Sequence, residues 1–130
     1  MTPQDLLYAE SHEWAYVTEE GGEKFAKVGI SAHAVEALTD LVYMDLPTVG
    51  TAVSAGSSFG EVESVKATSD LYSPVDGEIV DVNSSLPDNL DVLSTDPYEQ
   101  GWIIKVKLSS EDALSKLKDY EAYEKMCAEA

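Results

Sequence analysis

Apolar and polar residues alternate over short stretches throughout the first 108 residues, and glycine- or proline-containing turns separate these stretches. Residues 14–18 and 24–30 are predicted to pair as a hairpin, because Gly21 and Gly22 between them readily adopt the positive φ angles of a tight turn. Further short strands are predicted over residues 6–8, 41–46, 52–53, 57–63, 67–72, 78–82 and 102–108. Many short strands with close turns are typical of a β-sandwich or barrel.

Helical spacing appears in a few short segments. Ser31 is expected to cap a helix over residues 32–38, and a helical turn is expected near residues 89–93. Beyond residue 108, Ser109 and Asp112 fit a capping box.

Two helical stretches are predicted after that capping box, over residues 112–118 and 120–128. Tyr120, Tyr123 and Met126 recur at helical spacing. We expect this face to pack on the β body, with a partner-binding face as the alternative.

The length of 130 residues predicts one domain, with a β core over residues 6–108 and a helical C-terminal appendage over residues 109–130. The net charge of −17 argues against nucleic acids and anionic membranes as partners, because both carry negative charge. It favours a monomer whose partners carry basic docking surfaces, and a charge that serves only solubility is the alternative. A single cysteine, Cys127, excludes an internal disulfide and a cysteine-pair zinc site, so no metal site is predicted.

Catalytic motifs are absent from the sequence. There is no G-x-S-x-G elbow, no H-E-x-x-H pair and no glycine-rich phosphate loop, and with 25 acidic residues carboxylate pairs arise by coincidence. This favours a carrier or binding module over an enzyme.

Lys66 lies at the tip of the predicted hairpin between residues 57–63 and 67–72, and it is flanked by Val65 and Ala67. A lysine between small or β-branched neighbours on a tight turn is well presented to a modifying enzyme. An ordinary solvated turn lysine is the alternative.

Several motifs in order along the chain resemble those of the glycine cleavage system H proteins. They are Glu63-Ser-Val-Lys-Ala67 with Ser73-Pro-Val-Asp-Gly77, Ser11-His-Glu-Trp14, Val28-Gly-Ile-Ser leading to Asp40-Leu-Val-Tyr-Met-Asp-Leu-Pro47, and Asp96-Pro-Tyr98 with Gly101-Trp102. Biotinyl domains carry methionine on both sides of the lysine, and the lipoyl domains of 2-oxoacid dehydrogenases are shorter. The resemblance therefore favours the H proteins.

This resemblance implies a mostly β barrel-sandwich hybrid, lipoyl/biotinyl-like, with two antiparallel sheets, a short internal helix and C-terminal helices. It implies lipoic acid in amide linkage to Lys66, with Glu63, Val65 and Ala67 as the attachment motif. Glu63 is either read by the lipoylating enzyme or serves only to keep a strand end soluble.

The resemblance also implies a cleft that shelters the loaded arm. The matching positions are Ser11, Glu13, His33 and Asp70. Each has a structural alternative: Ser11 as a turn residue, Glu13 as a solvated strand-end acid, Asp70 as a hairpin end and His33 as a packing residue at a helix start.

The implied function is that of a carrier and not of an enzyme. It would take an aminomethyl group from glycine decarboxylase (P protein) to the tetrahydrofolate-dependent aminomethyltransferase (T protein). It would pass electrons to dihydrolipoamide dehydrogenase (L protein), and a lipoylating enzyme would be a further partner. A relay of lipoyl or octanoyl groups to other lipoyl domains, and an unmodified acidic adaptor, are the alternatives.

The resemblance implies the mitochondrial matrix as the compartment, with a transit peptide absent or removed, and the bacterial cytoplasm as the alternative. No signal peptide is visible at the N-terminus, and all eight basic residues are lysines, whereas transit peptides are rich in arginine.

Overall fold

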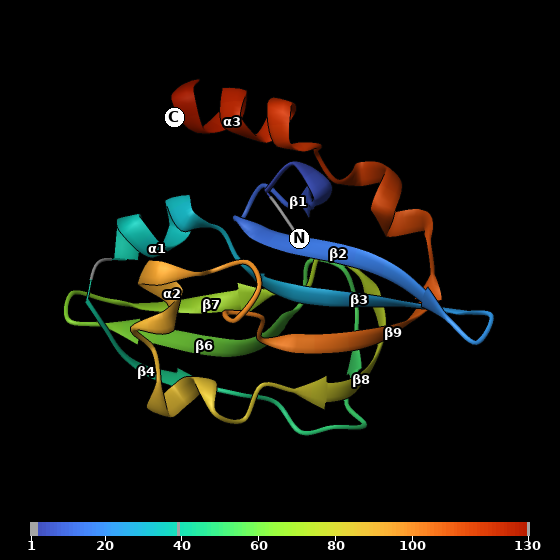
Figure 1. Ribbon diagram of the computed structural model, residues 1–130, viewed down its shortest axis with the longest axis horizontal. Coiled ribbons are helices and arrows are strands. Elements are labelled where there is room, and N and C mark those ends of the chain that lie inside the picture. Colours follow the sequence, from blue (N-terminus) through green and yellow to red (C-terminus); the bar gives the residue numbers. More distant parts are fainter. Residues whose placement is uncertain (1–2, 39, 130) are drawn as a thin grey trace.

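The computed structural model describes residues 3–38 and 40–129, which form two antiparallel sheets, with helices above them and at their left in Figure 1. One sheet has six strands in the order β1-β2-β3-β9-β8-β5, and the other has three in the order β4-β6-β7. The predicted mostly β barrel-sandwich architecture is confirmed.

The strands are short, as the sequence predicts. They are β1 (Leu7–Tyr8), β2 (Glu13–Glu20), β3 (Glu23–Ile30), β4 (Leu41–Asp45), β5 (Ala52–Val53), β6 (Ser58–Ser64), β7 (Thr68–Tyr72), β8 (Asp76–Val82) and β9 (Ile104–Ser110).

The helices comprise three α-helices and three 3₁₀ turns among the described residues. The α-helices are α1 (Ala32–Leu38), α2 (Val92–Thr95) and α3 (Tyr120–Glu129), and the 3₁₀ turns are η1 (Pro3–Asp5), η2 (Leu86–Asp88) and η3 (Asp112–Lys116). Within the described ranges, no helix combines the length and the apolar character needed to cross a membrane.

The β2–β3 hairpin forms where the alternation and the two glycines predict it. Its register runs from Glu13 opposite Ile30 to Glu20 opposite Glu23, and the two turn glycines have φ angles of 59° and 83°. Strand β9 pairs with both β3 and β8 and so connects the two halves of the larger sheet.

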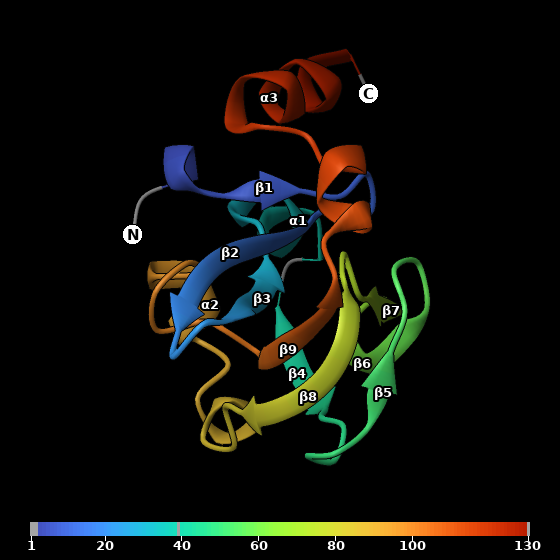
Figure 2. The same ribbon diagram turned by 90° about the vertical axis from the view of Figure 1, so that its right-hand side faces the viewer.

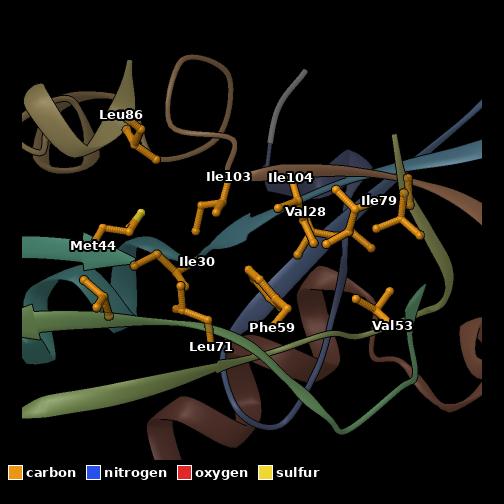
Figure 3. Close-up of a cluster of buried hydrophobic side chains, with 14 of the residues drawn as sticks. Val28, Ile30, Met44, Val53, Phe59, Leu71, Ile79, Leu86, Ile103 and Ile104 are labelled. Atoms are coloured by element: carbon orange, nitrogen blue, oxygen red, sulfur yellow. The ribbon is translucent and has the colours of Figure 1, made fainter. Parts of the chain in front are cut away.

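The main core lies between the two sheets. Figure 3 shows side chains from both sheets in this space, among them Ile30 of β3 and Leu71 of β7, each 2% exposed. Burial of such side chains contributes about 1.5–3 kcal/mol each to folding.

A second apolar cluster lies between β1 and α3, which Figure 2 shows above β1. The rings of Tyr8 and Tyr123 stack with their centroids 4.3 Å apart, and Trp14 belongs to the same cluster. The expectation that Tyr120, Tyr123 and Met126 pack on the β body is therefore confirmed.

The predicted capping box at Ser109 is wrong, because β9 continues through this residue to Ser110. Ser110 Oγ instead accepts a hydrogen bond from the backbone N–H of Asp112 at 3.1 Å, and the following turn is 3₁₀. Helix α3 is capped by Asp119, whose Oδ1 accepts from the N–H of Ala122 at 2.8 Å.

The Gly29→Ala substitution is expected to destabilise the fold by about 2 kcal/mol, because overpacking a filled core costs this order of energy. A Cβ at Gly29 would lie 2.5 Å from the ring of the fully buried Trp14. Urea unfolding measures the loss. The control is Gly21→Asn, since no atom lies within 4 Å of a Cβ there and asparagine tolerates a φ of 59°. Equal stability of Gly29→Ala and the wild type would contradict this reading.

Candidate functional site

Lys66 lies in the turn that joins β6 to β7, and one buried hydroxyl group holds this turn in shape. Ser64 Oγ accepts hydrogen bonds from the backbone N–H groups of Lys66 (3.3 Å) and Ala67 (3.1 Å). The backbone N–H of Ser64 donates to the carbonyl oxygen of Ala67 at 2.8 Å. Ser64 itself is 5% exposed. The turn is therefore fixed from inside while its outer face remains accessible.

The side chains around the turn point into solvent. Val65 is 67% exposed although it is apolar, and Glu63, Lys66 and Ala67 are also exposed. The backbone N–H of Val65 donates to the carbonyl oxygen of Asp40 at 3.0 Å, which ties the turn to the segment before β4.

The ammonium group of Lys66 takes part in no ion pair with any residue that the structure describes. Four other lysines differ in this respect, since they pair with glutamates: Lys24, Lys105, Lys107 and Lys118. A primary amine on a fixed turn, without a competing carboxylate, is well placed for acylation.

A cleft of about 220 Å³ opens beside the same hairpin, between its strands, α1 and the start of β2. Its polar lining comprises Ser11, His12, Glu13, Ser69 and Asp70, and its apolar lining includes Ile30, Val62 and Leu71. Because β6 and β7 contribute to both features, the cleft and the lysine turn belong to one rigid unit.

Glu13 is the buried acid of this cleft, at 2% exposure. Its Oε1 accepts a short hydrogen bond from the hydroxyl of Ser11, and its Oε2 accepts from the backbone N–H of Tyr72 at 3.1 Å. Burial raises the pKa of Glu13 above its ordinary value, and the two hydrogen bonds partly oppose this shift. A cation that enters the cleft would favour the charged carboxylate and so bind favourably.

The raised pKa of Glu13 has a consequence for stability that Glu13→Gln tests. The folded state holds the carboxyl proton of Glu13 more tightly than the unfolded state does. The stabilisation that comes from this tighter binding is present at low pH and is lost as the pH rises through the pKa of Glu13 in the folded state. The free energy of unfolding of Glu13→Gln should therefore rise relative to the wild type as the pH increases from the acidic range towards neutrality. Denaturant unfolding at several pH values measures it, with the exposed Glu61→Gln as control. A difference that does not change with pH would contradict the assignment.

Asp70 and His12 complete the polar side of the cleft. Asp70 is exposed, and its Oδ2 lies 3.4 Å from the hydroxyl of Tyr72. His12 has a positive φ of 80°, and its Nδ1 lies 2.7 Å from the hydroxyl of Tyr123. Burial and the neighbouring His33 lower the pKa of His12, which favours the neutral imidazole.

Comparisons with known proteins identify the family. The family model described as "Glycine cleavage H-protein" matches residues 6–130. The glycine cleavage system H protein of Rhodopirellula baltica is 62% identical over 128 residues, which cover 98% of this chain and 96% of that protein. The chain belongs to the glycine cleavage H-protein family.

Two further relatives of the H-protein family agree with this result. The glycine cleavage system H protein 2, mitochondrial, of Arabidopsis thaliana is 52% identical over 97% of this chain and 78% of that protein. The crystal structure of a glycine cleavage system H protein from Mycobacterium marinum superposes with a TM-score of 0.85 at 40% identity, over 98% of this chain and 99% of that one.

As a member of the H-protein family, the chain is a lipoyl-bearing carrier of the glycine cleavage system and not itself an enzyme. The family works with the P, T and L proteins of that system. The unmodified adaptor that the sequence left open does not fit this membership.

The structure brings together three of the four residues that resemblance to the H proteins placed in the cleft: Ser11, Glu13 and Asp70. His33 lies outside this lining and instead lines a separate groove beside α3, while His12 lines the cleft.

Three groups that shape the lysine turn or the cleft were not predicted from the sequence: Ser64, His12 and the backbone N–H of Tyr72. A serine two positions before a turn lysine could have suggested the hydroxyl-bonded turn. The other two depend on contacts between distant segments, which leave no local signal.

Proposed function

We propose that Lys66 is the residue to which the lipoyl group is attached. The observation that carries this proposal is the exposed, unpaired ammonium group on a turn fixed by Ser64, among the residues that the structure describes. The lipoyl group, when attached, supplies a dithiolane that takes up the aminomethyl group and accepts electrons. The chain's own contribution is to fix the point from which this arm extends.

A rigid base with a flexible tether suits a carrier that visits three enzymes. The tether gives each enzyme a high effective concentration of cargo. The backbone bond from Val65 to the Asp40 carbonyl and the internal bonds of Ser64 keep the start of the tether in one place.

We further propose that the lipoylating enzyme reads the side chains around Lys66. Val65 offers an exposed apolar contact, Ala67 leaves room beside the amine, and Glu63 offers a charge at the end of β6. These three residues share one exposed end of the hairpin.

We also propose that the cleft holds the amine-bearing end of the loaded arm. Glu13 would accept a hydrogen bond from a protonated amine. Burial disfavours the charged form of its carboxylate, and a cation beside the carboxylate offsets this cost. Ser11 and Tyr72 orient the carboxylate, and Asp70 places a second negative charge at the exposed edge. His12 takes the place that the sequence suggested for His33.

We propose the bacterial cytoplasm as the compartment, in place of the mitochondrial matrix expected from the sequence. The relative from Rhodopirellula baltica is 62% identical, whereas the mitochondrial protein of Arabidopsis thaliana is 52% identical. Relatives from Vibrio campbellii and Rubrobacter xylanophilus are bacterial as well.

The carrier and the relay alternative use the same lysine, so lipoylation alone does not distinguish them. Glycine–bicarbonate exchange in a reconstituted system does, because only the carrier supports it. The lipoylated protein should support exchange when mixed with glycine decarboxylase. A lipoylated protein that donates its lipoyl group to other domains but supports no exchange would favour the relay.

A further inference from the structure

We propose that His12, His33 and Cys127 form a three-ligand site for a borderline-soft divalent cation of the zinc class. The sequence does not predict this site, because its three residues are far apart in the chain. The structure brings their ligand atoms to within 4.8 Å of one another. They come from three segments: the loop before β2, helix α1 and helix α3.

The donor set is one that zinc prefers. Zinc binds imidazole nitrogen at about 2.0 Å and cysteine sulfur at about 2.3 Å, in tetrahedral geometry. A tetrahedral site therefore places its ligand atoms about 3.5 Å apart. Closing the cluster to this size takes a shift of roughly 1 Å, which the exposed His33 side chain can supply from the surface of α1.

One ring nitrogen of His12 is already oriented by an outer partner. Its Nδ1 lies 2.7 Å from the hydroxyl of Tyr123, and that hydroxyl lies 2.5 Å from Ser31 Oγ. Metal-bound imidazoles usually bond through their second nitrogen in this way, which fixes the ring and leaves the first nitrogen for the metal. Tyr123 is thus a positioning residue, one helical turn before Cys127 on the same helix.

Three protein ligands leave one tetrahedral position for water. His33 and Cys127 also line a groove of about 530 Å³, which has room for it. Glu36 and Glu124 line the same groove, so weak cation binding by carboxylates has to be distinguished from binding by the thiolate.

Binding would add a further link between segments that are now joined by packing and by the hydrogen bonds of Tyr123. A cation on the three side chains would tie α3 to α1 and would hold His12, which lines the cleft beside Glu13. We therefore expect Zn²⁺ to slow hydrogen exchange of the α3 amides.

The test is titration of the full-length chain with Co²⁺ as a spectroscopic probe for Zn²⁺. The lipoyl arm is left off, because a dithiol would itself bind the metal, and Cys127 is kept reduced. The expected result is a thiolate-to-Co²⁺ charge-transfer band with visible absorption typical of tetrahedral Co²⁺, both removed by Zn²⁺. Loss of an outer partner of a metal ligand costs roughly 10- to 100-fold in affinity, and loss of a ligand itself should cost at least as much. Cys127→Ser and His33→Ala should therefore each weaken Co²⁺ binding by roughly 100-fold.

Glu36→Gln is the matched control, because it removes a charge from the same groove without removing a ligand. It should leave the spectrum unchanged. The absence of the charge-transfer band in the wild type, or its persistence in Cys127→Ser, would overturn the proposal. So would an unchanged Co²⁺ affinity in His33→Ala. Hydrogen exchange adds a second measurement, in which Zn²⁺ should protect α3 in the wild type but not in Cys127→Ser.

Discussion

The Lys66→Arg protein is expected to fold normally and to support no glycine–bicarbonate exchange above background. Arginine keeps the positive charge at the exposed tip of the β6–β7 turn, but its guanidinium does not form the amide that a lysine amine forms with lipoic acid. The turn should be unaffected, because Ser64 holds it through backbone groups and not through the lysine side chain.

The measurement is isotope exchange in the reconstituted system, with thermal unfolding as the test of folding. Lys116→Arg is the matched control, since Lys116 is also an exposed lysine but lies on η3, outside the β6–β7 hairpin. It should retain full exchange. Substantial exchange by Lys66→Arg would show that another residue carries the arm.

The Glu13→Gln protein is expected to lose its cargo to water about 30-fold faster than the wild type does. Truncating one member of a buried, hydrogen-bonded charge pair costs about 2 kcal/mol or more, and about 1.4 kcal/mol corresponds to tenfold. Glutamine keeps the shape of the side chain and removes the charge, so the substitution isolates the proposed attraction between the carboxylate and the protonated amine. The low exposure of Glu13 strengthens this attraction, because water is largely excluded from the carboxylate.

Release of formaldehyde and ammonia from the loaded carrier, without folate or the aminomethyltransferase, measures this loss. Glu61→Gln is the control, because Glu61 pairs with Asp70 across the β6–β7 ladder but is exposed and outside the cleft. It should release cargo at the wild-type rate. Equal release rates from Glu13→Gln and the wild type would remove Glu13 from the proposed shelter.

The positions of the strands along the chain could be predicted from local patterns, because each pattern carries its own physical signal. The two glycines at residues 21–22 allow the backbone of the β2–β3 turn, and period-two alternation marks the strands on either side. The capping at Ser109 failed because β9 runs on through Ser109 to Ser110, and the pairing of β9 with β8 that extends the strand this far leaves no local signal at Ser109 and Asp112. Ser110 instead bonds the start of η3 through its hydroxyl.

The turn that carries Lys66 could be predicted from the sequence, because β6 and β7 are adjacent in the chain, but the details of the cleft could not. Glu13 is an acid at a strand end, and its burial depends on β7 approaching it through the N–H of Tyr72. His12 and not His33 lines the cleft, and the loop before β2 has a left-handed backbone at His12, which no alternation pattern encodes.

The site of lipoylation tests the central claim most directly. The measurement is the intact mass of the full-length protein after incubation with a lipoylating enzyme and lipoate, followed by peptide mapping. We expect a mass increase of one lipoyl group, located on Lys66. No mass increase, or a lipoyl group mapped to any other lysine, would contradict it.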